Sequence, residues 1–79
     1  MKLSIISLKG VEFEGEVKSV NLKTTSGEIT VLDNHRALIT ALAPGKATVI
    51  TKEENTVSFE IRSGFLEVGE GNRATILSN

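Results

Sequence analysis

The sequence predicts an all-β domain, an antiparallel β-sandwich or flattened barrel of about eight to ten short strands. Apolar and polar residues alternate with a period of two along most of the 79 residues, as in strands that bury one face. Turn-forming residues separate these runs roughly every 8–12 positions. No stretch of about ten or more residues has the 3.6-residue period of an amphipathic helix. Residues 1–79 are therefore expected to form one domain with one modest core.

The first two strands are expected before and after a tight turn at Leu8-Lys9-Gly10, where glycine supplies the conformational freedom of the turn. The first covers Lys2–Ile6, with Leu3 and Ile5 on one face. In the second, Val11, Phe13, Gly15 and Val17 share one face and the intervening charged residues share the other. The apolar phase slips after Val17. One extra residue produces such a slip, so a β-bulge or bend is expected near Lys18-Ser19.

The middle of the chain alternates short strands with polar turns. Thr24–Gly27 is a cluster of turn residues, and Glu28–Leu32 is a short strand. Asp33-Asn34 is expected to turn, because asparagine tolerates the left-handed backbone conformation. Arg36–Leu42 is compatible with a strand or with a single helical turn. Its β-branched residues and the stop at Pro44 favour a strand.

The last part of the chain contains the clearest half-buried strand, Val57–Arg62, in which apolar and polar residues alternate strictly. It follows a charged hairpin turn at Glu53–Asn55, and a second turn is expected at Glu70–Asn72. The other strands of this part are expected at Lys46–Lys52, Phe65–Val68 and Arg73–Leu77.

Composition excludes several kinds of site. The chain has no cysteine and one histidine, which excludes disulfides and thiolate or multi-histidine metal centres. A net charge of −1, with three phenylalanines and neither Trp nor Tyr, argues against nucleic-acid binding. No apolar run approaches the roughly 18 residues of a membrane helix, and no signal peptide is recognised. We therefore expect a cytoplasmic protein whose partners are other proteins.

The titratable residues do not assemble into catalytic chemistry. Asp33 and His35 are near each other in sequence, but no nucleophile elbow presents a serine to them. His35 is expected to bond the backbone of a turn or to lie at an interface. Glu12, Glu14 and Glu16 are expected to form a solvated strand face, since a calcium site needs six to eight converging oxygens. We expect no catalytic residue, no metal and no cofactor.

An ordered set of short motifs resembles the epsilon subunit of the F-type ATP synthase. The first is Val11-Glu12-Phe13-Glu14-Gly15-Glu16-Val17, which is similar to the family's F-x-G-x-V strand. The resemblance covers nearly the whole chain with no long gap in spacing. Its later motifs are Gly27-Glu28, Val31-Leu32, His35, Leu38-Ile39-Thr40, Leu42, Pro44-Gly45, Ser63-Gly64-Phe65-Leu66-Glu67-Val68, and Asn72 followed by Ala74-Thr75-Ile76-Leu77.

The resemblance implies the family's N-terminal β-sandwich and a non-catalytic role in the central stalk. Such a subunit couples ion-driven rotation of the c-ring to ATP synthesis through contacts with the gamma subunit and the c-ring. It would lie peripherally at the cytoplasmic face of the membrane, or in the organellar equivalent, and meet the membrane only through the complex. By position, the c-ring contacts would be Ser26, Gly27, Glu28 and Ile29, and the gamma contacts Ser7, His35 and Thr40.

Two departures from the family pattern are visible. The family usually has Pro-Gly before the histidine and Ala-Pro after it, where this chain has Asp33-Asn34 and Arg36-Ala37. This turn is expected to be less rigid, and Arg36 either contacts gamma or faces water. The family's C-terminal helical hairpin, which inhibits ATP hydrolysis, is not expected in this sequence.

Leu32–Ala37 also fits the pattern I/L-D-x-x-R-A of an ATP site in some epsilon subunits. In those proteins the pattern begins the helical domain, so we interpret the match within the β domain as coincidence.

The main alternative function is a free-standing β-barrel adaptor that binds a peptide at a sheet edge. An oligonucleotide-binding barrel and an enzyme agree less well with the charge and the residues described above.

Overall fold

The computed structural model describes residues 1–79 and contains eight strands and no helix. The all-β prediction is therefore confirmed. No helix is present that could cross a bilayer. The strands are β1 (Lys2–Ser7), β2 (Gly10–Thr24), β3 (Gly27–Leu32), β4 (Leu38–Leu42), β5 (Gly45–Thr51), β6 (Thr56–Ile61), β7 (Gly64–Gly69) and β8 (Arg73–Ser78).

Strand β2 takes part in both layers of the sandwich. The first part of its 15 residues pairs with β1, and its second part pairs with β3 on one side and β5 on the other. Its register with β5 shifts between Val17 and Ser19, which confirms the predicted bulge. An extra residue bends the strand and increases its twist. This bend carries β2 from one layer into the other.

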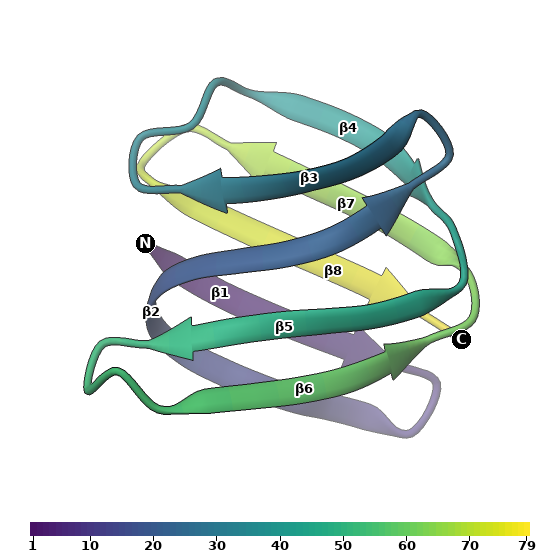
Figure 1. Cartoon of the computed structure of the whole chain (residues 1–79), viewed down its shortest axis with the longest axis horizontal. Helices are drawn as coiled ribbons and strands as arrows, with labels where there is room; N and C mark the ends of the chain where they lie inside the picture. Colours follow the sequence, from purple (N-terminus) through teal and green to yellow (C-terminus); the bar gives the residue numbers. More distant parts are fainter.

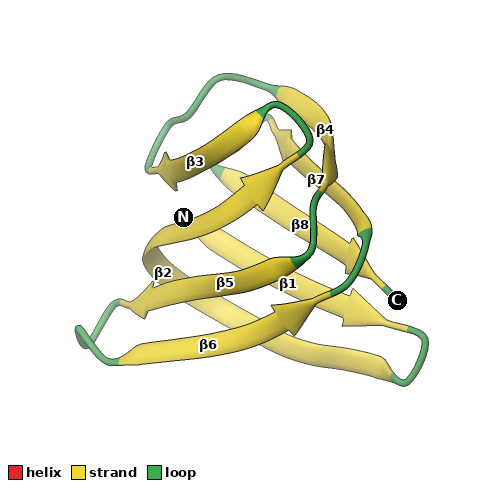
Figure 2. Ribbon diagram, turned by 45° about the vertical axis from the view of Figure 1, so that its right-hand side comes forward, coloured by secondary structure: helices red, strands yellow, loops and turns green.

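The first layer has the order β2–β1–β8–β7–β4, and the second has the order β3–β2–β5–β6 (Figures 1 and 2). A single residue pair, Thr24 and Leu42, links β2 to β4. All neighbouring strands run antiparallel except β1 and β8, which are parallel. The antiparallel sandwich predicted from the sequence is thus confirmed, and this one parallel pair is a feature that the sequence did not indicate. It arises because the first and last strands of the chain lie side by side and run toward the same end.

The turns gather at two opposite ends of the sandwich (Figure 1). The N-terminal end holds Met1 and the connections at residues 33–37, 52–55 and 70–72. The C-terminal end holds Asn79 and the connections at residues 8–9, 25–26, 43–44 and 62–63. Residues that are close in sequence, such as the two ends of β3, therefore reach opposite ends of the domain.

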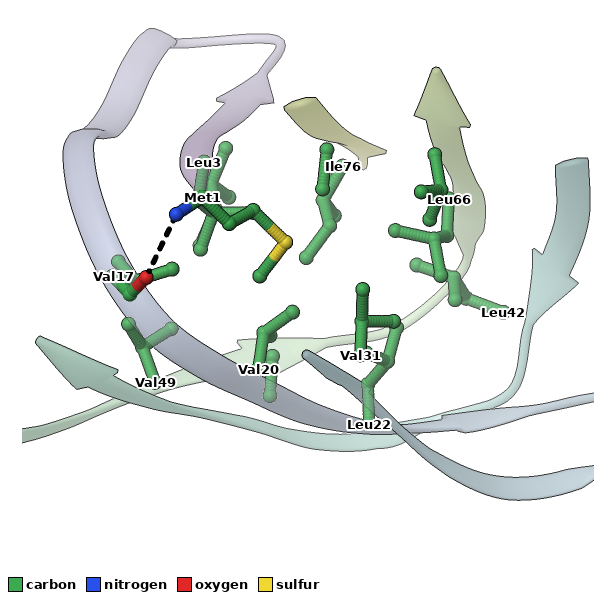
Figure 3. Close-up of a cluster of buried hydrophobic side chains, with 14 of the residues drawn as sticks. Met1, Leu3, Val17, Val20, Leu22, Val31, Leu42, Val49, Leu66 and Ile76 are labelled. Atoms are coloured by element: carbon green, nitrogen blue, oxygen red, sulfur yellow. Dashed lines mark hydrogen bonds between the residues drawn. The ribbon is translucent and has the colours of Figure 1, made fainter. Parts of the chain in front are cut away.

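The core lies between the two layers and is wholly aliphatic apart from Met1 (Figure 3). Both layers contribute alternate residues of their strands, which is the period-two pattern of the sequence expressed in space. The most deeply buried large side chains are Leu3, Ile5, Val20, Leu22, Val31, Val49, Leu66 and Ile76. Phe13 and Phe59 pack edge to face at the margin of this core, with ring centroids 5.8 Å apart.

Two local predictions differ from the structure. Strand β4 begins at Leu38 instead of Arg36, because the loop before it crosses from β3 in the second layer to β4 in the first. Val11 was expected to share a face with Phe13, but a second irregularity pairs Val11 with Ile6 and Phe13 with Ile5. Val11 is therefore turned outward and is 63% exposed.

Gly64 begins β7 where that strand passes close to the end of β8. Its φ is 144°, and a Cβ at this position would overlap the carbonyl oxygen of Leu77. The backbone conformation and the close approach both require glycine here.

Replacing Gly64 with alanine is expected to lower the free energy of unfolding by at least about 2 kcal/mol, through overpacking and backbone strain. Urea denaturation measures this change. Gly69→Ala is the matched control, because a Cβ there meets no atom and its φ is not in the left-handed region. Equal stability of the two variants would contradict the assignment of Gly64.

Candidate protein-interaction surfaces

The turn between β2 and β3 is held from within by a buried threonine. The hydroxyl of Thr24 donates a hydrogen bond to the carbonyl of Gly27 at 2.7 Å and accepts one from the amide of Ser26 at 3.1 Å. Gly27 has a φ of 125°, which favours glycine. The four residues predicted to meet a c-ring therefore lie together at the C-terminal end, on a turn whose backbone is fixed.

Glu28 and Ile29 differ in what they offer at this turn. Glu28 is exposed, and no cation lies within ion-pair distance of its carboxylate. Its register partner across the ladder is Lys23. Ile29 is half-buried and packs against the core. Glu28 is thus the member of the predicted set that presents a free charge, whereas Ile29 mainly anchors the strand.

The three residues predicted to meet gamma do not form a cluster. Ser7 lies at the C-terminal end, where its hydroxyl donates to Glu12 Oε2 at 3.1 Å and accepts from the amide of Lys9 at 3.1 Å. His35 lies at the opposite end, in the loop between β3 and β4. Thr40 is half-buried in the middle of β4. One partner that touches all three must extend along the length of the sandwich.

His35 sits in the turn that follows β3. Its amide donates to the carbonyl of Leu32 at 3.2 Å, and its ring Nδ1 lies 2.7 Å from the carbonyl oxygen of Arg36. Because a carbonyl only accepts, Nδ1 is the donor in this hydrogen bond. Asn34 has a φ of 61°, which confirms the predicted turn. Asp33 and His35 share no hydrogen bond, and Arg36 is exposed.

The carboxylate of Asp33 is instead engaged by two donors. The N-terminal ammonium of Met1 donates to Asp33 Oδ1 at 2.6 Å, and Asn72 Nδ2 donates to the same oxygen at 3.3 Å. These hydrogen bonds, the ammonium's first, lower the pKa of Asp33 below its ordinary 3.8. The hydrogen bond to Asp33 raises the pKa of the amino group above 8.0. The ion pair thus links the start of the chain to the loop of His35.

The acidic face of β2 is partnered by the neighbouring strand. Beyond the bond from Ser7 to Glu12, Glu14 accepts from Ser4 Oγ at 3.5 Å, and Glu16 lies 3.5 Å from the N-terminal ammonium. These carboxylates do not converge on one point, and no group of three or more potential ligands is placed to hold a metal ion.

Sequence reasoning missed a row of apolar side chains on the outer face of the first layer. Strand registers align Val11 with Ile6, Ile6 with Leu77, Leu77 with Phe65, and Phe65 with Ala41. We call these five residues the apolar row. Phe65 and Leu77 are 56% and 51% exposed. Contiguous exposed apolar surface of this kind is a mark of interaction sites.

The period-two alternation of residues in β7 and β8 indicates from the sequence that Phe65 and Leu77 point to the opposite face from Leu66 and Ile76. The pairing that aligns them is non-local and was not readable from the sequence.

A shallow groove of about 400 Å³ lies between β6 and the β1–β2 turn. Its apolar lining includes Phe59, Ile61 and the 91% exposed Leu8 at the tip of the turn. Strand β6 pairs only with β5, so its other edge faces this opening. The contact between Phe13 and Phe59 fills the adjoining part of the gap.

Comparison with known proteins gives a consistent result. The family described as ATP synthase, Delta/Epsilon chain, beta-sandwich domain matches residues 1–79. The ATP synthase epsilon chain of Clostridium novyi is 39% identical over 67 residues, which are 85% of this chain and 51% of the relative. That of Chlorobium limicola is 35% identical over 77 residues, covering 98% of this chain and 86% of the relative. The chain spans about half the length of the first curated relatives it matches.

Two solved assemblies contain chains with the same fold. A chain in the Euglena gracilis mitochondrial ATP synthase, in a structure of OSCP, F1 and c-ring, superposes with a TM-score of 0.89 at 25% identity, covering 96% of this chain and 48% of the other. A chain in the central stalk and c-ring of the Tetrahymena thermophila enzyme superposes with a TM-score of 0.83 at 17% identity, covering 99% and 62%. The second likeness concerns the fold alone.

Replacing Asp33 with asparagine is expected to remove a pH-dependent part of the stability. The ionised carboxylate stabilises the fold above its ordinary pKa, and this stabilisation is lost as pH falls through the lowered pKa. The amino group contributes below 8.0, and its contribution is lost as pH rises through the raised value. The free energy of unfolding of the wild type should therefore exceed that of Asp33→Asn by the largest amount between about pH 5 and 8.

Urea denaturation across pH tests this expectation, with the exposed Glu53→Gln at the same end of the sandwich as a control. A stability difference that is independent of pH would contradict a role for the charge.

Proposed function

This chain belongs to the β-sandwich family of ATP synthase delta and epsilon chains, and we propose that it is a non-catalytic subunit of the central stalk of a rotary ATP synthase. The observation that carries the proposal is the match of all 79 residues to this family. The subunit couples ion-driven rotation of a c-ring to ATP synthesis through contacts with gamma and the c-ring. It sits peripherally at the cytoplasmic face of the membrane, held there by the complex.

The proposed c-ring contact is the β2–β3 turn at the C-terminal end. Torque passes through a contact only if the contact resists deformation. The hydrogen bonds of the buried Thr24 hydroxyl hold the backbone of this turn, and Glu28 adds an unpaired charge at its outer side. A charged residue on a rigid support selects a partner by charge complementarity. Polar loops of a c-ring are such a partner.

The proposed gamma contact uses the outer face of the first layer. Ser7 follows Ile6 in β1 and Thr40 precedes Ala41 in β4, so the side chains of Ser7 and Thr40 point to the opposite face of the layer from the apolar row. Ser7 and Thr40 therefore remain gamma contacts that we propose from the family resemblance alone. Aromatic side chains such as Phe65 are enriched in protein interfaces, where a few anchor residues carry most of the binding energy. His35 extends the contact toward the N-terminal end.

The alternative function, a β-barrel adaptor that binds a peptide at a sheet edge, draws support from the unpaired edge of β6 beside its groove. Purification of the chain from its native membrane separates the two functions. The stalk proposal requires gamma and c subunits to co-purify with the chain. Recovery of neither subunit, together with an extended peptide bound at β6, would favour the adaptor instead.

Glu28→Arg is expected to reduce assembly with the c-ring at least about tenfold, because it reverses the charge that Glu28 presents at the turn. The isolated fold should lose no more than about 1 kcal/mol, since the side chain is exposed and the main change is that its cross-strand pairing with Lys23 becomes one of like charges. The yield of c subunits on co-purification and the thermal unfolding curve measure the two effects. Glu53→Arg, at the opposite end, is the control. Normal assembly and coupling in the Glu28 variant would exclude this turn as the c-ring contact.

Phe65→Ser is expected to weaken binding to isolated gamma at least about tenfold, because it removes the one aromatic side chain of the apolar row. Leu32→Ser is the matched control. Both side chains are 56% exposed, but Leu32 lies on β3 in the second layer. Calorimetric titration with gamma measures the change. Equal losses in the two variants would show that the apolar row is not the contact.

A further inference from the structure

The loop of His35 has few restraints of its own. Residues 33–37 contain neither proline nor glycine, although they must cross from one layer to the other. Their local backbone hydrogen bond is the one from the His35 amide to Leu32. Asn34 adopts the left-handed conformation, with a φ of 61°, which asparagine tolerates but which leaves its amide without a backbone partner in the loop. Restraint of this loop must therefore come from elsewhere in the fold.

The Met1 ammonium holds the Asp33 carboxylate, and Asn72, in the turn between β7 and β8, supplies the restraint on the turn backbone. Its Oδ1 accepts a hydrogen bond from the amide of Asn34 at 2.7 Å, and its Nδ2 donates to Asp33 Oδ1 at 3.3 Å. Its own carbonyl accepts from the amide of Lys2 at 3.0 Å. One side chain thus satisfies a donor and an acceptor on adjacent residues of the turn that precedes His35.

The chemistry of this position calls for an amide. An aspartate would offer only acceptors and would face the Asp33 carboxylate, and a serine has a single hydroxyl in place of the amide's separate donor and acceptor. Asn72 also has a φ of 59°, a conformation that asparagine tolerates better than most residues. Backbone and side chain together favour asparagine.

We propose that Asn72 is a positioning residue, which holds the His35 loop in the conformation that meets the gamma subunit. The proposal rests on the proposed function for the identity of the partner, whereas the restraint on the loop does not. Asn72 does not touch gamma itself. It acts through the Asn34 amide and the Asp33 carboxylate, which lie one and two residues before His35.

Asn72→Gly tests the restraint in the full chain without gamma. Glycine removes the side chain but accepts the left-handed backbone, so the fold is kept. Exchange of the Asn34 amide, followed by NMR, should accelerate at least about fivefold relative to core amides. Asn55→Gly is the control, because Asn55 lies at the same end and its hydrogen bonds use only its backbone. Unchanged exchange at Asn34 would overturn the proposal.

Titration with gamma tests the consequence for binding. Asn72→Gly should weaken binding about fivefold, and the loss should shrink when His35→Ala is already present, since the two residues act through one contact. Asn72→Asp should also weaken binding. Because Asp33→Asn also loses the ion pair with Met1, Asp33→Asn alone is the reference. In that background Asn72→Asp should cost less affinity than it does in the wild type, because the new amide at position 33 and the new carboxylate at position 72 again form a donor–acceptor pair.

The two experiments distinguish failure of the positioning role of Asn72 from failure of the proposed function. Faster exchange with wild-type affinity for gamma would overturn the positioning role. Absence of gamma binding by the wild-type chain would overturn the proposed function, whatever the exchange data.

Discussion

The whole architecture depends on the passage of β2 from one layer to the other. A strand that stayed in one plane would leave β1 and β5 on the same sheet, with a single apolar face and nothing to cover it. The extra residue near Lys18 bends β2 instead, so its two parts border opposite sides of one core. A domain of 79 residues has too little apolar surface to form two separate cores. One covalently continuous strand in both layers makes a single core possible.

The bend also determines how the surfaces are distributed. Because the layers face each other, their connections fall at two ends, and their outward side chains form two broad faces. The β2–β3 turn and the His35 loop become opposite poles of the molecule, although β3 alone separates them. The apolar row runs across strands instead of along one. A partner that reads this surface therefore recognises the pairing of strands, and not a linear motif.

The sequence predicted those features that depend on local chemistry. Period-two alternation, the phase slip after Val17 and the turn at Asn34 each follow from properties of neighbouring residues, and the structure confirms them. The parallel pairing of β1 with β8 and the bridge from Asn72 to the His35 loop join residues far apart in sequence. No property of the neighbouring residues in the sequence indicates such pairings. The residues predicted to meet gamma and the c-ring came from the family resemblance, and they remain predictions.

The neighbouring position of β1 and β8 has a consequence for how the chain folds. Leu3 pairs with Ala74 and Ile5 with Ile76, so β1 completes its ladder only with β8, at the far end of the domain sequence. Contacts between such distant residues carry a large loop-closure cost and slow folding. Until β8 emerges, one edge of β1 stays unpaired, with apolar residues on its inner face. At that stage β1 is paired only with β2, along its other edge, and its free edge can associate with other chains.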